Sequence, residues 1–223
     1  MFKRSLLAAT VLAVAATPAL ASAATLTVDK PCFSDGYVDG PKQKIGFTAG
    51  GFPADAFVQL NGGFDNSYIG DFTTTAGGGF EGEFDTPSLG SLKRMTFPLS
   101  AALSPNREVS ASTTFTVADA AVSMSPPVAR PTTKVSYKAQ GFVGGKFLYA
   151  HYAYTKSPVS HPLVKTVKLG ALTGPCGDLT TKKAKQLPLA KLKRKTVYEI
   201  QIDASPVFKR QQGNYITRTV FVP

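Results

Sequence analysis

Apolar and polar residues alternate in short runs along most of the chain, and turns rich in Gly, Pro or Asn separate these runs. Alternation with a period of two places the apolar side chains on one face of a strand, and no long run has the helical period. In the first half the pattern predicts strands over 25–29, 44–49, 56–60, 68–74, 80–84, 95–101 and 109–117. In the second half it predicts strands over 121–124, 134–140, 146–154, 164–169, 196–203 and 215–222. The chain is therefore expected to be all-β.

Residues 47–60, FTAGGFPADAFVQL, have an echo ninety residues later at 137–150, YKAQGFVGGKFLYA. The pair Gly51-Phe52 falls on Gly141-Phe142, and the closing strands TTFTV and RTVFV also correspond. A repeat at a fixed spacing indicates two copies of one module. At each corner the Gly is expected to have a positive φ, and the Phe is expected to plug the end of the module.

About seven short strands with regular turns are typical of an immunoglobulin-like sandwich. We therefore predict two tandem immunoglobulin-like β-sandwiches, with domain 1 over 24–119 and domain 2 over 120–223. Residues 1–23 have a basic head, an apolar centre and a small-residue cleavage pattern, as in a secretory signal peptide. The apolar centre is short for a membrane span of about 20 residues. The mature chain is expected to be secreted, extracellular or associated with the cell envelope, with no transmembrane segment.

Five motifs carry a family resemblance. They are PCFSDG at 31–36, GFPADAFVQL at 51–60, STTFTV at 112–117, LYAHY at 148–152 and GPCG at 174–177. On these motifs the chain resembles the tandem immunoglobulin-like modules of secreted actinobacterial proteins, which implies the fold but no settled activity. Through SDG at 34–36, domain 1 is also faintly similar to neocarzinostatin-type apoproteins. Those proteins hold two short disulfide loops in one domain, whereas domain 1 has only Cys32, so no chromophore-carrier role is implied.

The two cysteines, Cys32 and Cys176, lie one in each domain. An exported protein with an even number of cysteines is expected to pair them. Cys32 follows the first strand, at the end of domain 1 where the chain leaves, and Cys176 lies in the hairpin loop equivalent to 76–79, at the end of domain 2 where the chain enters. We therefore predict a Cys32–Cys176 bridge; free thiols and an intermolecular pair are the alternatives.

Charge is divided unevenly between the two domains. Residues 24–119 hold 6 basic and 11 acidic residues, a net charge of −5, whereas 120–223 hold 17 basic and 3 acidic residues, a net charge of +14. This asymmetry indicates an anionic partner for domain 2; a merely solvated basic face is the alternative. The candidate ligand-binding residues are Lys182, Lys183, Lys185, Lys191, Lys193, Arg194 and Lys195. In an extended chain 191, 193 and 195 project to one side, and Tyr198 and Tyr215 are candidate stacking platforms for sugars or bases.

No catalytic or metal-binding constellation emerges from the remaining residues. His151 lies in an alternating strand and is expected to be structural. His161 stands beside Ser160, but no oriented acid or nucleophile turn accompanies it. Two histidines and two distant cysteines do not form a zinc set. The loop carboxylates do not follow a calcium-loop spacing; they are Asp35, Asp39, Asp65 and Asp71. We predict no catalytic residue, no metal and no cofactor.

The leading functional hypothesis is a secreted, non-enzymatic binding or adhesion protein, in which basic domain 2 contacts an anionic envelope polymer or glycan. The second is a structural protein that assembles when the acidic domain of one molecule docks on the basic domain of the next. The third is an accessory protein or inhibitor of a secreted enzyme. A protein partner fits the second and third hypotheses, and nucleic acid is disfavoured.

Overall fold

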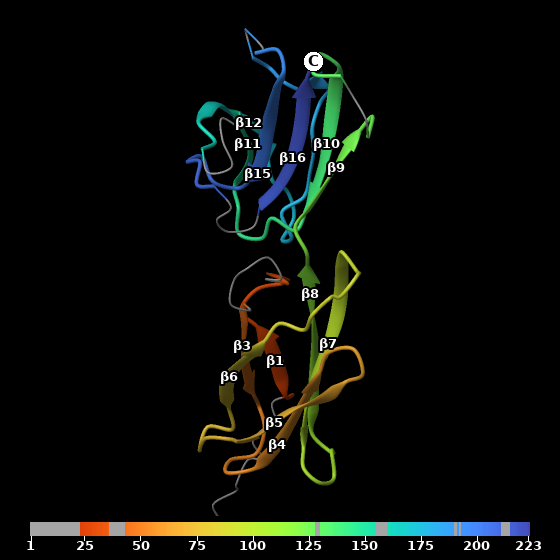
Figure 1. Ribbon diagram of the computed structural model, residues 1–223. Helices are drawn as coiled ribbons and strands as arrows, with labels where there is room; N and C mark the ends of the chain where they lie inside the picture. The colour runs from red at the N-terminus through yellow and green to blue at the C-terminus, as the bar shows by residue number, and fades with distance from the viewer. Residues whose placement is uncertain are drawn as a thin grey trace, which may run out of the picture.

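The computed structural model describes residues 23–35, 43–127, 130–154, 160–189, 191, 193–210 and 215–223. Within these residues the chain forms sixteen strands and no helix, so none of them contributes a helix long and apolar enough to cross a membrane. Residues 1–22 of the expected signal peptide lie outside the described part. Two lobes follow one another end to end (Figure 1), with β1–β8 in the first and β9–β16 in the second.

The first lobe, here called the first sandwich, contains two sheets with the orders β1–β3–β6 and β2–β8–β7–β4–β5. Its strands are β1 Thr25–Val28, β2 Cys32–Ser34, β3 Lys44–Gly50, β4 Phe57–Gly62, β5 Ser67–Thr73, β6 Phe80–Asp85, β7 Arg94–Leu103 and β8 Ser110–Ala118. Alternation in β3 buries Ile45, Phe47 and Ala49, which share one apolar core with residues of the opposite sheet such as Phe97 and Phe115. This core includes buried residues from 26 to 117.

The second lobe, here called the second sandwich, has its own core, with buried residues from 120 to 222. One sheet groups β9, β13 and β14 around β10, and the other has the order β12–β11–β15–β16. Its strands are β9 Ala121–Ser125, β10 Lys134–Gln140, β11 Phe147–Tyr154, β12 Leu163–Ala171, β13 Leu179–Thr180, β14 Ala184–Lys185, β15 Thr196–Asp203 and β16 Tyr215–Val222.

The two sandwiches repeat one pairing scheme. β4 lies between β5 and β7 in the first sandwich, as β11 lies between β12 and β15 in the second. β3 pairs with β1 and β6, and its counterpart β10 pairs with β9, β13 and β14. The predicted fold class, two tandem immunoglobulin-like β-sandwiches, is confirmed.

Three short strands differ from the expectation. The alternation predicts no strand between 29 and 44, but β2 pairs in parallel with β8, with Cys32 opposite Thr116. β13 and β14 were not predicted, because two-residue strands carry no alternation that a sequence could display. These two strands pair with β10 in the position that β6 occupies beside β3. All three strands depend on a partner that is distant in sequence.

The repeated Gly-Phe corner has the expected conformation. Gly51 and Gly141 have φ values of +77° and +78°, and Phe52 and Phe142 are both buried. A side chain would collide at either glycine: a Cβ on Gly141 would stand 2.1 Å from the carbonyl oxygen of Asp119. Each corner therefore packs directly against the backbone that precedes the first strand of its own sandwich.

The junction between the sandwiches is short and bonded several times. Only Asp119 and Ala120 separate β8 from β9. The predicted disulfide is confirmed: Cys32 of β2 bonds to Cys176, with a Cα–Cα distance of 5.3 Å. Both cysteines are buried, in a small cluster with Ala118 and Val143. Two further contacts cross the junction, namely the two-pronged ion pair of Arg94 with Asp178 and a hydrogen bond from Gln140 Nε2 to the Lys93 carbonyl, 3.3 Å.

Gly141→Ala should destabilise the protein far more than Gly144→Ala. Gly144 has the same φ, +79°, but a Cβ there would meet nothing within 4 Å. Both variants should lose about 1–2 kcal/mol of stability, because alanine is strained in the left-handed backbone conformation. Only Gly141→Ala adds a collision with backbone, so its free energy of unfolding should fall by about 2 kcal/mol more. Urea unfolding followed by circular dichroism measures both; equal losses would contradict the packing at Asp119.

Removing the disulfide should loosen the junction. In the unreduced, denatured protein neither cysteine should react with a maleimide, whereas both should react after reduction. The double variant Cys32→Ser and Cys176→Ser should lose at most about 4–5 kcal/mol of stability, because the bridge closes a long loop. It should also give a broader interatomic distance distribution in small-angle X-ray scattering. Labelling of either cysteine before reduction would rule out the bridge.

Candidate anion-binding surface

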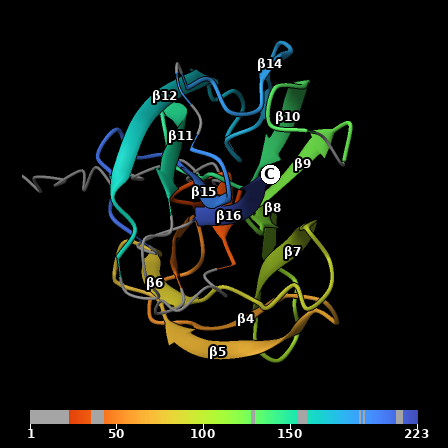
Figure 2. The same cartoon turned by 45° about the horizontal axis from the view of Figure 1, so that its top comes forward.

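The predicted basic residues lie on the stretch from β13 to β15 of the second sandwich. β14 pairs antiparallel with β10, which places Lys185 opposite Lys134; Figure 2 shows β14 beside the start of β10. Lys182 and Lys183 belong to the connection between β13 and β14 and are exposed, as is Lys185. Lys134 was absent from the predicted set, because only the pairing of two distant strands brings it to this surface.

The segment 186–195 closes the end of the second sandwich. The amide of Gln186 donates a hydrogen bond of 2.9 Å to the Thr133 carbonyl, and the side chain of Leu187 is fully buried in the core. From β12, Lys165 Nζ donates a hydrogen bond of 3.0 Å to a backbone carbonyl of the segment. The segment is therefore bonded to both sheets, and its own basic side chains face outward.

Two tyrosines hold the last part of this segment. Tyr198 Oη accepts a hydrogen bond of 3.0 Å from the amide of Lys193, and Lys193 Nζ stands 4.2 Å from the centre of the Tyr154 ring. A cation over an aromatic face is favourable. The stacking role predicted for Tyr198 is wrong, because its side chain is core and the residue is only 2% exposed. Lys195 follows in a turn with φ +52°.

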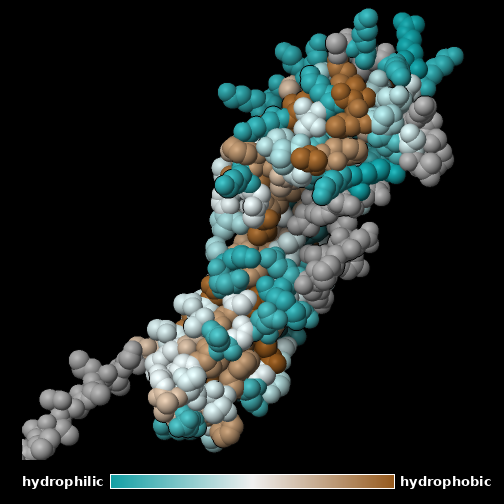
Figure 3. Space-filling view, turned by 90° about the vertical axis from the view of Figure 1, so that its left-hand side faces the viewer, coloured by the Kyte–Doolittle hydropathy of each residue, from teal (hydrophilic) through white to brown (hydrophobic). Residues whose placement is uncertain are grey.

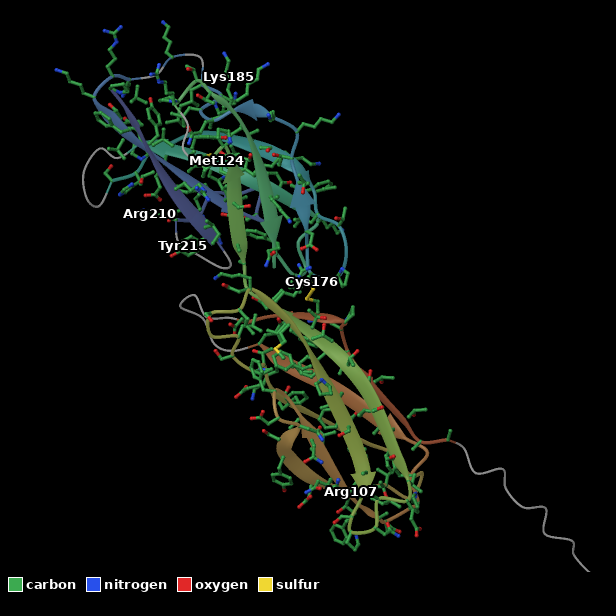
Figure 4. All side chains as sticks on the ribbon, turned by 90° about the vertical axis from the view of Figure 1, so that its right-hand side faces the viewer. Arg107, Met124, Cys176, Lys185, Arg210 and Tyr215 are labelled. Atoms are coloured by element: carbon green, nitrogen blue, oxygen red, sulfur yellow. A yellow bond between two sulfur atoms is a disulfide. The ribbon has the colours of Figure 1, made fainter. Side chains whose placement is uncertain are left out.

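We call the resulting surface the basic pole. It consists of Lys134, Lys182, Lys183, Lys185, Lys191, Lys193, Arg194 and Lys195, all of them exposed. Figure 4 places Lys185 at the free end of the second sandwich, Cys176 at the junction and Arg107 at the opposite end of the molecule. Hydrophilic side chains project from that free end in Figure 3. The pole therefore lies at the end of the second sandwich that is opposite the junction.

The three acidic residues of the second half all have partners other than the pole lysines. Asp178 forms the ion pair with Arg94 at the junction. Glu199 Oε2 lies 3.3 Å from His161 Nδ1 and 3.7 Å from Arg210. Asp203 Oδ1 lies 3.2 Å from His151 Nε2. The basic pole consequently has no carboxylate side chain of its own half to neutralise it.

Buried tyrosines do not supply the missing negative charge. Burial raises the pKa of Tyr137 and of Tyr152, so both hydroxyls stay neutral below pH of about 10. The hydroxyl of Tyr137 is also buried without a hydrogen-bond partner, whereas that of Tyr198 is bonded. The second sandwich therefore keeps its excess of positive charge across the physiological pH range.

Two further details of the predicted site differ in the structure. Lys191, Lys193 and Lys195 do not alternate along a strand, because this segment is a loop that ends in a turn before β15. Tyr215 pairs with Asp203 at the start of β16, whereas the basic pole lies beyond the opposite end of that strand. Neither predicted stacking platform is therefore available beside the lysines.

Both histidines are held by hydrogen bonds or ion pairs. His151 is fully buried, with Nε2 donating to the Ser205 carbonyl at 3.0 Å and to Asp203 at 3.2 Å. Nδ1 lies 2.9 Å from Thr166 Oγ1, within hydrogen-bond distance. The structural role expected for His151 fits this network. His161 Nδ1 lies 3.3 Å from Glu199 Oε2.

The loop carboxylates are dispersed. Asp35 is buried and accepts a backbone N–H at 3.1 Å, and Asp71 accepts a hydrogen bond that raises the pKa of Tyr68. Asp65 is exposed, and Asp39 lies outside the described residues. Across the described part of the chain, no three His, Cys, Asp or Glu side chains come close enough to hold a metal ion.

No protein-family model matches this sequence, and no curated protein matches it. Solved structures of tandem repeat domains align with it. A tetra-tandem repeat of a large adhesion protein is 14% identical, with 89% of this chain and 48% of that chain covered and a TM-score of 0.29. A bacterial ice-binding adhesin is 13% identical, with 91% and 66% covered and a TM-score of 0.35. Three N-terminal domains of the bacteriophage RB49 outer capsid protein Hoc are 12% identical, with 90% and 71% covered and a TM-score of 0.39. The chain spans less than two thirds of the first two structures.

Tyr198→Phe should destabilise the second sandwich, whereas Tyr137→Phe should not. The first change removes the acceptor of the Lys193 amide and should lower the free energy of unfolding by about 1 kcal/mol. The second removes a buried hydroxyl that bonds to nothing, so it should be neutral or stabilising. Denaturant unfolding of the two variants and the parent measures this difference. An equal loss in both would contradict the attachment of the loop through Tyr198.

Proposed function

We propose that the protein is an extracellular, non-enzymatic binding protein whose basic pole contacts an anionic polymer or glycan of a cell envelope. The observation that supports this proposal is the basic pole itself, eight exposed cationic side chains at one end of the molecule. Residues 24–119 and 120–223 then act as two domains with separate roles. The second domain binds the ligand, and the first domain projects away from the ligand.

The electrostatics favour an extended, multiply charged ligand over a small one. The eight cations are spread over β10, β14, the connection before β14 and the loop before β15. One exposed cation–anion contact contributes little to the free energy of binding. Many such contacts along one polymer add up, and the resulting affinity falls as the salt concentration rises. A polyanion fits this surface better than a monovalent anion does.

The extracellular location rests on two features. The Cys32–Cys176 bridge needs an oxidising compartment to form and persist. The predicted signal peptide at 1–23 directs export. A ligand of the cell envelope is consistent with both.

Charge reversal at the pole should abolish polyanion binding. The variant Lys182→Glu, Lys183→Glu and Lys185→Glu should elute from immobilised heparin at far lower salt than the parent, because repulsion replaces attraction. The matched control carries the same three changes at Lys138, Lys146 and Lys168, which are exposed and belong to the same sandwich but not to the pole. The control should keep most of the affinity; an equal fall in both variants would show that net charge, not the pole, governs binding.

Self-assembly is a second candidate function, favoured by one feature of the first sandwich. Asp29, Glu81 and Glu83 line a shallow depression of about 440 Å³, which Gly46 also lines. This acidic face complements the basic pole of another copy. Concentration-dependent association of the protein alone in sedimentation velocity, abolished by the charge reversal at the pole, would favour assembly over polymer binding.

A further inference from the structure

Exposed apolar side chains lie beside the basic pole. Val197 of β15 and Phe221 of β16 are directly opposite one another in the antiparallel ladder. They are 37% and 59% exposed, although β15 buries six of its eight residues. Val197 is only two residues from Lys195. This apolar pair is therefore continuous with the cationic loop.

A second exposed apolar pair lies at the same end of that sheet. Leu163 and Val164 begin β12 and are 45% and 46% exposed. Because β12 runs antiparallel to β11, its start lies beside the end of β11, where Tyr154 contacts Lys193. Figure 3 shows hydrophobic patches among the hydrophilic projections at this end of the molecule. Three of the four strands of the sheet thus bring exposed apolar side chains to the pole.

Single exposed apolar residues are common on protein surfaces, but a cluster of them next to many cations indicates a particular kind of ligand. A soluble polyanion would neutralise the lysines and leave Val197 and Phe221 in water. A surface that presents anionic headgroups above acyl chains would satisfy both groups of side chains. The combination of charge and apolarity favours a lipid surface over a purely polar polymer.

We propose that the basic pole binds an anionic lipid surface, with its lysines at the headgroups and Phe221 and Val197 entering the boundary of the acyl chains. This inference uses the same cations as the proposed function but goes beyond it, because it assigns them a lipid surface as a ligand. The pole is at the free end of the second sandwich, so the first sandwich stands away from the lipid (Figure 1, Figure 4). The second sandwich then contacts the membrane, and the first sandwich projects from it into the solvent.

The first experiment separates the apolar contribution from the charge. Sedimentation with vesicles of equal parts phosphatidylglycerol and phosphatidylcholine measures lipid binding, and dextran sulfate is the polyanion without acyl chains. The variant Val197→Thr and Phe221→Thr should bind the vesicles at least about tenfold more weakly, because its apolar side chains no longer transfer from water. Its affinity for dextran sulfate should stay unchanged. The matched control, Phe57→Thr and Val207→Thr, removes one Phe and one Val outside the pole that are at least as exposed, and it should bind both probes like the parent.

The outcomes distinguish the two proposals. Parent-like vesicle binding by the Val197→Thr and Phe221→Thr variant, or binding of the parent to dextran sulfate alone, overturns the lipid inference and leaves polyanion binding intact. Parent-like binding of both probes by the charge-reversed pole variant overturns the proposed function as well. Circular dichroism melts of all variants check that each is folded.

A second experiment reports insertion directly. The chain contains no Trp, so Phe221→Trp and Phe57→Trp each introduce a single fluorophore. On addition of the same vesicles, Phe221→Trp should shift its emission to shorter wavelength and be quenched by spin labels on the acyl chains. Phe57→Trp should show neither change. Absence of a shift and of quenching in Phe221→Trp would overturn the insertion.

Discussion

The rest of the structure depends on how the chain passes from one sandwich to the next. Two residues connect β8 to β9, and the backbone of Asp119 lies against Gly141, where no side chain fits. The disulfide between Cys32 and Cys176 also links the two sandwiches at this junction. A linker this short, attached at several points, leaves the two sandwiches little freedom to bend. They therefore extend end to end, and each has one free end.

This arrangement decides where charge can accumulate. The acids of the second half already have partners: Asp178 pairs with Arg94 at the junction, Glu199 lies beside Arg210, and Asp203 accepts hydrogen bonds from Gln201 and Ser205. Such partners offset the cost of removing a carboxylate from water. At the free end the lysines of the pole remain exposed. Positive charge and exposed apolar side chains thus share one surface, far from the first sandwich.

Core residues contact the loop that carries four of these cations. Leu187 is buried in the core, and Lys193 contacts the hydroxyl of Tyr198 and the ring of Tyr154. A basic side chain that is already held in place loses less conformational entropy on binding than a free one does. Core aromatic residues therefore contribute to the surface by positioning it rather than by touching a ligand.

The sequence by itself determined the features that are local or periodic. Alternation predicted the long strands, and the repeated Gly-Phe corner predicted both the duplication and the positive φ at Gly51 and Gly141. The even cysteine count, with one cysteine in each half, predicted the bridge. The tertiary structure alone decided the features that require distant partners: the parallel pairing of β2 with β8, the short strands along β10, the addition of Lys134 to the pole and the burial of Tyr198. The physical reason is that a two- or three-residue strand has no period to read, and the face that a side chain presents is fixed by the strand packed against it.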